Sequence, residues 1–108
     1  MMQFRLATVA DIDAIFVVRF AVKENVLSNP ARVTREMCID YLDKLGRGWV
    51  CEVEGRVVGF SYAARADHSI WALFVLPDFE GRGVGKALLN AAVDWLFEIG
   101  AERVILST

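Results

Sequence analysis

The amino-acid sequence predicts one mixed α/β domain whose elements follow the order β-α-α-β-β-β-α-β. Short segments with alternating or continuous apolar residues indicate strands, and longer segments with apolar residues three and four apart indicate helices. A glycine-rich junction between the fourth predicted strand and the third predicted helix is the third observation. The chain has 108 residues, of which 56% are hydrophobic, so it suits a single domain with a real core.

The first predicted strand covers residues 4–7, where apolar and polar residues alternate briefly. Thr8 and Asp11 then form an imperfect capping box, which predicts the start of a helix. The residues that recur at helical spacing in this helix are Ile12, Ile15, Phe16, Arg19 and Phe20. Residues 24–30 predict a loop, because Ser-Asn-Pro favours a turn and proline disfavours helix before it.

A second helix is predicted to begin after Thr34, which can cap it, and to end at Gly46. One side of this helix carries Met37, Tyr41, Leu42 and Leu45. Two apolar segments follow, at residues 49–53 and 57–63, and they flank a Glu-Gly dipeptide at residues 54–55. Such a dipeptide between two strand-like segments predicts a β-hairpin.

The last part of the chain predicts a strand, a long helix and a final strand. Residues 69–76 form the apolar strand that leads into the glycine-rich junction. The helix over residues 83–99 has a polar face, formed by Lys86, Asn90, Asp94 and Glu98. Its inward face carries Leu88, Leu89, Ala92, Val93, Leu96 and Ile99. Gly100 predicts the end of this helix, and residues 104–106 predict the start of the last strand.

Composition and charge exclude several classes of protein. A formal net charge of −2 argues against a nucleic-acid partner, which normally requires a basic surface. No apolar run approaches the length needed to cross a bilayer, and the first residues do not resemble a secretory signal. Cys38 and Cys51 have neither metal-like spacing nor the number expected of a disulfide framework. We therefore expect buried thiols, a cytoplasmic location, no metal and no membrane partner.

The glycine-rich junction is the most informative segment of the chain. An apolar strand runs through Pro77 into three alternating glycines, Gly81, Gly83 and Gly85, and then directly into a helix. Glycines let the main chain approach a ligand closely, and the first turn of a helix offers unpaired N–H groups to an anion. The helix dipole adds about 0.3–1 kcal/mol in favour of negative charge there. The segment therefore predicts a phosphate site, the alternative being a tight turn that binds nothing.

Two common phosphate loops do not fit this junction. Gly85 and Lys86 match the Gly-Lys of a P-loop, but Glu80 stands where its first glycine belongs and Ala87 replaces its hydroxyl residue. The dinucleotide-binding fingerprint requires a different third spacing and follows the first strand of its fold. Here the loop follows late strands, so this interpretation also fails.

Gly83-Val84-Gly85 instead resembles motif A of the GNAT superfamily, the GCN5-related N-acetyltransferases, whose pattern is [Q/R]-x-x-G-x-[G/A] between a strand and a helix. The preceding Leu-Phe-Val-x-Pro and the following Lys-Ala-Leu-Leu are typical companions, whereas Glu80 departs from the usual Gln or Arg. The predicted element order is that of the first five strands and three helices of a GNAT domain. The resemblance therefore implies that residues 1–108 form a single acyl-CoA-binding domain with a mainly antiparallel sheet. A fourth helix and two strands would follow in the family, so we expect a domain truncated at its C-terminus.

The resemblance implies an N-acetyltransferase that moves an acetyl group from acetyl-CoA to a primary amine of an unidentified small molecule or peptide. The pantetheine would lie beside Phe74 and Val75. The pyrophosphate would rest on main-chain amides of Arg82, Gly83, Val84, Gly85 and Lys86. Glu80 is expected to make no contact with the pyrophosphate, because its carboxylate would repel the negatively charged phosphate groups.

The catalytic and acceptor residues are less well determined by the resemblance. Many relatives carry a glutamate base in the fourth strand, where this chain has none, so Asp67 and His68 at the start of that strand are the candidates for the base. The candidates for acceptor binding are Arg19, Glu24, Asn25 and Ser28, each of which is otherwise a solvated surface residue. Trp49 and Trp71 are expected in the core rather than at an acceptor platform.

Two other functions remain open from the sequence. The chain is alternatively a non-catalytic acyl-CoA-binding module that keeps the glycine loop without chemistry. It is alternatively an oligomerising fragment, in which an open sheet edge pairs with another copy to form a homodimer.

Overall fold

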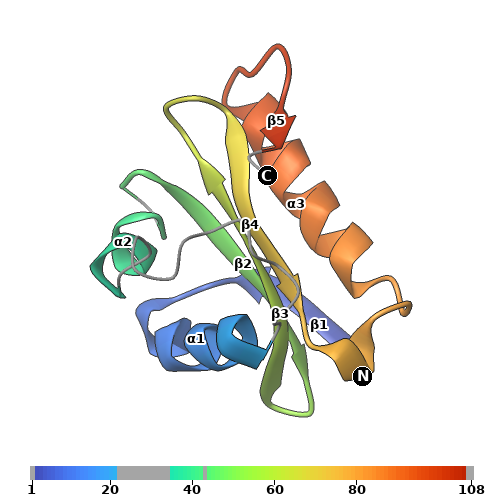
Figure 1. The fold of residues 1–108 in the computed structure, drawn as a ribbon. Coiled ribbons are helices and arrows are strands. Elements are labelled where there is room, and N and C mark those ends of the chain that lie inside the picture. The colour runs from blue at the N-terminus through green and yellow to red at the C-terminus, as the bar shows by residue number, and fades with distance from the viewer. Residues whose placement is uncertain (1, 22–34, 43, 107–108) are drawn as a thin grey trace.

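The computed structural model of the chain describes residues 2–21, 35–42 and 44–106. Five strands form one sheet in sequence order, and all neighbours are antiparallel except β4 and β5, which are parallel (Figure 1). The strands are β1 (Met2–Leu6), β2 (Gly46–Val53), β3 (Arg56–Ala64), β4 (Ser69–Val75) and β5 (Ile105–Leu106). The predicted mixed α/β fold and its element order are therefore confirmed.

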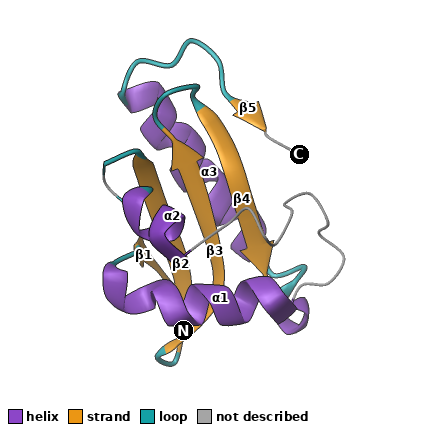
Figure 2. Cartoon of the chain, turned by 60° about the vertical axis from the view of Figure 1, so that its left-hand side comes forward, coloured by secondary structure: helices purple, strands orange, loops and turns teal. Residues whose placement is uncertain are grey.

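Helices cover both faces of the sheet. The helices of the described residues are α1 (Ile12–Ala21), α2 (Arg35–Asp40) and α3 (Val84–Glu98), with short 3-10 turns η1 (Val9–Asp11) and η2 (Pro77–Phe79). The first two lie on one face and α3 lies on the other (Figures 1 and 2). In the described residues no helix is both long and apolar enough to cross a membrane.

Each face of the sheet has its own aromatic core. Against α3, Trp49 and Trp95 meet edge to face with their ring centroids 5.8 Å apart. Against α1 and α2, Phe60 stacks on Phe74 at 5.2 Å, and the buried Tyr62 hydroxyl donates a hydrogen bond to the Cys38 carbonyl at 3.0 Å. The strands thus alternate their side chains between two packed layers, as expected of a sheet covered on both faces.

The β2–β3 hairpin forms where the Glu-Gly dipeptide predicts it. Glu54 and Gly55 have φ values of 50° and 81°, and Val53 pairs with Arg56 across the turn. Positive φ at both central positions is the signature of a type I′ turn, whose twist matches that of the strands. The hairpin prediction is therefore confirmed.

Helix α3 also agrees with its predicted faces. The four residues of the predicted polar face are exposed, whereas Leu88, Ala92 and Leu96 are buried against the sheet. Gly100, with φ of 108°, follows the helix at the predicted stop. Trp95 joins the buried face as well, a position that the helical spacing did not single out.

The predicted end of the second helix is wrong. Helix α2 ends at Asp40, and Gly46 is the first residue of β2. A Cβ at Gly46 would lie 1.9 Å from the carbonyl oxygen of Ala63 on β3, so glycine is needed there for close strand approach. The predicted loop at residues 24–30 and the predicted cap at Thr34 lie outside the described residues.

The first helix begins as its capping box predicts, through η1. The Thr8 N–H donates a hydrogen bond to Asp11 Oδ2 at 2.8 Å. Most of the predicted apolar positions then face the sheet, but Phe20 is 63% exposed and lies on the outer side of α1. Cys38 and Cys51 are free and buried, as expected.

Candidate functional site

The glycine loop turns the chain from β4 into α3 with two residues in the left-handed region. Gly81 has φ of 78° and Gly83 has φ of 83°, and Gly83 is the N-cap of α3. A Cβ at either position would meet no atom within 4 Å, so backbone conformation rather than crowding requires glycine there. Gly85 differs, because a Cβ there would lie 3.7 Å from Val75 Cγ2, in ordinary contact.

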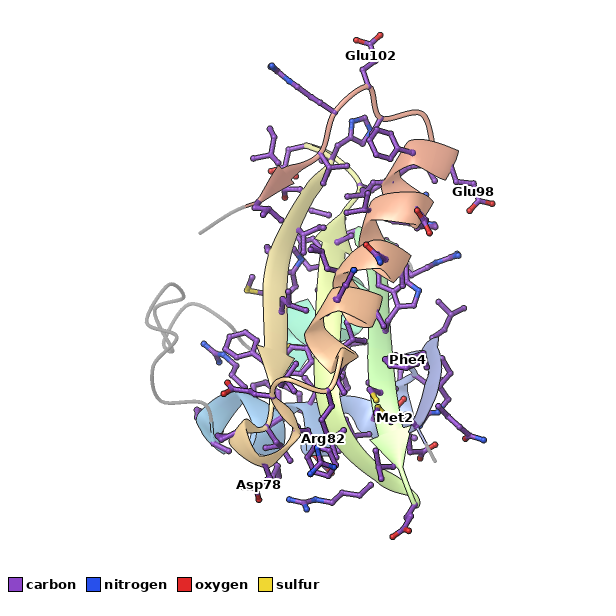
Figure 3. The ribbon with its side chains drawn as sticks, turned by 90° about the vertical axis from the view of Figure 1, so that its right-hand side faces the viewer. Met2, Phe4, Asp78, Arg82, Glu98 and Glu102 are labelled. Carbon is purple, nitrogen blue, oxygen red and sulfur yellow. The ribbon has the colours of Figure 1, made fainter. Side chains whose placement is uncertain are left out.

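The start of α3 has no side-chain cap from its N-cap residue, Gly83. Gly83 has no side chain to cap the helix, so the first-turn N–H groups keep their positive end open. Arg82 is exposed beside this turn, and its guanidinium carbon lies 5.2 Å from the centroid of the Phe79 ring. Figure 3 shows Arg82 at this end of α3 and Glu98 at the other end. The positive end of the α3 dipole and the positively charged Arg82 side chain therefore lie next to each other.

One side of β4 has no strand partner next to this loop among the residues that the structure describes. Strand β5 pairs with β4 only at Ser69 and Ile70, and no strand of the described residues pairs with β4 beyond Ile70 on that side (Figure 2). The Leu76 N–H donates to the Val58 carbonyl on β3 at 2.8 Å. Because main-chain groups alternate in direction along a strand, Leu73 and Val75 present theirs to the open side.

The same alternation turns the main-chain groups of Phe74 toward β3, where its carbonyl oxygen would lie 3.1 Å from a Cβ at Gly59. Phe74 therefore offers a buried ring rather than main-chain groups to this region. Leu73, which the sequence analysis did not name, presents its main-chain groups to the open side instead. The apolar strand was visible in the sequence, but the pairing partner that decides the direction of each N–H was not.

A β-bulge interrupts β4 between its two ends. Consecutive residues Tyr62 and Ala63 on β3 pair with Ala72 and Ile70, so Trp71 is an extra residue on β4. Its indole packs between two tyrosines on the α2 side of the sheet: the ring centroid lies 4.9 Å from that of Tyr62, in a stacked arrangement, and 5.1 Å from that of Tyr41. Bulges re-aim side chains, and this one places Trp71 on the same face as Ala72.

A small cavity lies beside the bulge, between the sheet and the two helices of that face. It has a volume of about 10 Å³, and its lining residues are Ile15, Arg19, Cys38, Phe60, Trp71, Ala72 and Phe74. The Nε1 atom of Trp71 is buried and has no hydrogen-bond partner among the residues that the structure describes. Trp71 packs against the core, as expected, with an indole N–H that no described residue accepts.

Asp67 and His68 lie together in the turn before β4, at the end opposite the glycine loop. Asp67 Oδ1 accepts a hydrogen bond from the Ser69 hydroxyl at 2.6 Å. His68 has φ of 52°, and its carbonyl accepts a hydrogen bond from the Ile105 N–H at 3.1 Å. Both residues line an open surface pocket together with Arg103 and Glu102.

Of the four residues expected to bind the acceptor, only Arg19 belongs to the described part of the chain. It is 8% exposed, lies in the last turn of α1 and lines the cavity beside Trp71. Glu24, Asn25 and Ser28 lie outside the described residues. The structure thus brings Arg19 to β4 and gives no position for the other three.

Two buried groups near the cavity stay neutral at physiological pH. Burial raises the pKa of the Cys38 thiol above its ordinary value, and burial likewise raises the pKa of Tyr62. A thiol with a raised pKa is a poor nucleophile, and the Tyr62 hydroxyl is already engaged with the Cys38 carbonyl. Both residues therefore have packing roles.

A comparison with known protein families identifies the chain. Residues 11–108 match the sequence profile of the acetyltransferase (GNAT) family. The chain belongs to the GNAT acetyltransferase family. The resemblance to this family, drawn from the sequence, is therefore confirmed.

Two curated relatives of this GNAT chain are acetyltransferases. A mycothiol acetyltransferase of Propionibacterium freudenreichii subsp. shermanii is 37% identical over 76 residues, which cover 65% of this chain and 24% of the relative. An uncharacterised N-acetyltransferase of Methanocaldococcus jannaschii is 39% identical over 67 residues, which cover 54% of this chain and 30% of the relative. The chain therefore spans less than a third of the length of either relative.

A solved GNAT structure shares the fold. The PaiA N-acetyltransferase of Thermoplasma acidophilum, determined in complex with coenzyme A, aligns with a TM-score of 0.76 at 15% identity. The alignment covers 93% of this chain and 74% of that protein. At this identity the likeness shows the fold alone.

Proposed function

We propose that this chain binds acetyl-CoA and forms the cofactor-binding portion of an N-acetyltransferase that acts on a primary amine. One observation carries the proposal: an uncapped helix start in a left-handed glycine loop directly adjoins an open strand edge. An anion site continuous with unpaired main-chain donors and acceptors suits a ligand that has a pyrophosphate at one end and amide groups along an arm. Coenzyme A has both.

The pyrophosphate is assigned to the main-chain amides of residues 82–86. Gly83 and Gly85 leave space for close approach, and the dipole of the 15-residue α3 favours negative charge at its start. Arg82 and Lys86 are exposed at the same turn and add positive charge. Glu80, also exposed, lies outside this assignment.

The pantetheine arm is assigned to the open side of β4. Its two amides would pair with the outward main-chain groups of Val75 and Leu73, as a further strand would. The main-chain groups of Phe74 face β3, so Phe74 contributes only its buried ring, which packs against Phe60 beneath this edge of the sheet. When bound, the cofactor supplies an activated acyl group as a thioester, and the protein's part is to align it.

Proton removal from the amine is assigned to Asp67 or His68. They precede Trp71 by four and three residues and lie in the turn before β4, so at most about 10–13 Å of chain separates them from the bulge. A single bridging water spans only two hydrogen bonds, so proton transfer over the full distance requires a chain of several waters. The hydrogen bond from Ser69 fixes the Asp67 carboxylate at the mouth of the strand.

Calorimetric titration with acetyl-CoA tests the cofactor assignment. We expect binding of acetyl-CoA, weaker binding of 3′,5′-ADP, which lacks the pyrophosphate and pantetheine, and acetyl-dependent release of free thiol when an amine is added. Absence of binding by acetyl-CoA and by CoA contradicts the proposal. Binding without turnover on any amine would instead identify a non-catalytic acyl-CoA-binding module.

A further inference from the structure

The Trp71 bulge lies where an acyl group carried along β4 would end. Trp71 precedes Val75 by four residues, which is about 13 Å of strand. A pantetheine that pairs with Val75 and Leu73 runs toward this bulge, so its thioester end would arrive beside Trp71. The cavity lined by Trp71 lies at the same point, on the face that α1 and α2 cover.

The Trp71 indole is held in place, but its N–H has no hydrogen-bond partner among the residues that the structure describes. Tyr62 and Tyr41 pack against the ring from two directions. The buried Nε1 atom has no hydrogen-bond partner within the described ranges. An unmatched buried donor is unfavourable by about 1–3 kcal/mol, so a ring fixed in this way favours a ligand that supplies an acceptor atom.

The polar groups around the cavity are donors. The indole N–H can only donate, and the guanidinium of Arg19 donates and carries positive charge. Cys38 is a neutral thiol because burial raises its pKa, and the other lining residues are apolar. None of the described residues that line the cavity is a carboxylate, so an ammonium group would find no negatively charged side chain among them.

The size of the cavity limits what can enter it. A volume of about 10 Å³ is close to that of one water molecule. It therefore has room for about one water-sized atom. An oxygen atom satisfies both the size and the donor-only chemistry.

Resting on the acetyltransferase function proposed above, we propose that the acceptor amine carries an oxygen atom close to its nitrogen, as in an α-amino acid or the amino end of a peptide. That carbonyl or carboxylate oxygen binds the Trp71 Nε1–H in the cavity beside the bulge. Arg19 adds favourable charge for a carboxylate and disfavours a second cationic amine. Trp71 is thus a specificity-determining residue, and simple polyamines are poor acceptors.

The indole N–H resonances in ¹⁵N-labelled protein test this assignment directly. The chain has three tryptophans, and Trp71→Phe assigns the Trp71 signal while keeping an aromatic ring between the tyrosines. We expect glycinamide, glycine and alanyl-alanine amide to shift the Trp71 signal in the wild-type protein. Ethylamine and cadaverine, which lack the oxygen, should leave it unchanged. The Trp95 signal, on the opposite face, serves as the internal control.

Kinetics with the same amines provide a second readout. We expect Trp71→Phe to lower kcat/KM about threefold to tenfold for the oxygen-bearing amines, the loss of one hydrogen bond, and to leave the oxygen-free amines unchanged. Trp49→Phe, in the core on the α3 face, is the matched control and should not alter the preference.

Several results overturn the inference. The inference is wrong if both sets of amines shift the Trp71 signal equally, or if the oxygen-free set shifts it more. It is also wrong if no amine shifts the signal because a permanent water fills the cavity. These failures are distinct from failure of the proposed function. If acetyl-CoA binds and the indole signal does not discriminate, only the inference fails; if acetyl-CoA does not bind, the proposed function fails whatever the indole reports.

Discussion

Arg5 holds the carboxylate of Asp11 with two parallel hydrogen bonds, of 2.8 Å from Nη1 to Oδ2 and 2.9 Å from Nη2 to Oδ1. Asp11 is buried and also accepts the Thr8 N–H, so one carboxylate joins β1 to the start of α1. The hydrogen bonds from Arg5 are the largest cause of the lowered pKa of Asp11. Charge-assisted pairs of this geometry are among the stronger polar interactions in proteins.

The Arg5–Asp11 pair makes the free energy of unfolding depend on pH, and it stabilises the fold less as the pH falls. Because the pKa of Asp11 is lower in the folded chain than in the unfolded chain, its contribution is complete above the ordinary value of about 3.9 and disappears as the pH falls through the folded pKa. We expect Asp11→Asn to lower the free energy of unfolding by about 1–3 kcal/mol at pH 7. The difference in the free energy of unfolding between the variant and the wild type should become smaller below about pH 4.

Urea denaturation of both proteins at pH 7 and at pH 3 measures this difference. Glu54→Gln, which changes an exposed carboxylate in the hairpin turn, is the matched control and should show little effect at either pH. If the difference in the free energy of unfolding between Asp11→Asn and the wild type is the same at both pH values, the role assigned to Asp11 is contradicted.

Gly83→Ala separates backbone strain from ligand binding. Gly83 and Gly55 have nearly the same φ, 83° and 81°, and a Cβ at either position would meet no atom within 4 Å. Alanine should therefore destabilise the chain by about 1 kcal/mol at each position. Only Gly83→Ala is expected to weaken acetyl-CoA binding, about tenfold or more, in calorimetric titration. Equal losses of affinity in the two variants would remove the glycine loop from the site.

Gly85→Ala should move stability and binding in opposite directions. The new Cβ would contact Val75 Cγ2 at an ordinary 3.7 Å. Alanine is favoured over glycine by about 1 kcal/mol in a helix interior, and by less in the first turn, where Gly85 lies. We therefore expect a higher urea midpoint. The same methyl group stands at the amides assigned to the pyrophosphate, so acetyl-CoA affinity should fall. A variant that is more stable and binds equally well would show that the ligand does not approach Gly85.

Hydrogen exchange tests which main-chain groups of β4 are available. Alternation along the strand turns the Phe74 N–H toward β3 and leaves the N–H groups of Leu73 and Val75 on the open side. We expect Phe74 to be protected without ligand. Acetyl-CoA should slow exchange at Leu73 and Val75 by at least about tenfold, the factor that 1.4 kcal/mol of added protection gives. Protection that appears at Phe74 alone would reverse the proposed direction of the strand.

Much of the fold follows from local patterns in the sequence. Apolar spacing, the Glu-Gly turn at residues 54–55 and the glycines before α3 each depend on neighbours a few residues apart, and the structure confirms them. Gly46 illustrates the opposite case. It looks like a helix stop in sequence, but the carbonyl of Ala63, which lies 17 residues further along the chain, is what excludes a side chain there.

The sequence predicts those parts of the candidate site that consist of residues next to one another in the chain. The glycine loop is a contiguous segment and is visible in the sequence. The open side of β4, the choice of Leu73 and Val75, and the bulge at Trp71 depend on how β4 pairs with β3 and β5, which no single segment encodes. The Trp71 indole N–H, which no described residue accepts, likewise depends on how Tyr41 and Tyr62 pack against the ring.

The single parallel pair in the sheet ties the shape of the ligand site to a distant helix. β5 reaches β4 only by way of α3, since the chain crosses over the sheet between them. Leu88, Ala92 and Leu96 bury the helix against the sheet and so fix where the chain returns to form β5. We therefore expect substitutions at these three positions to shift the place of β5 beside β4, and with it the edge to which the cofactor is assigned.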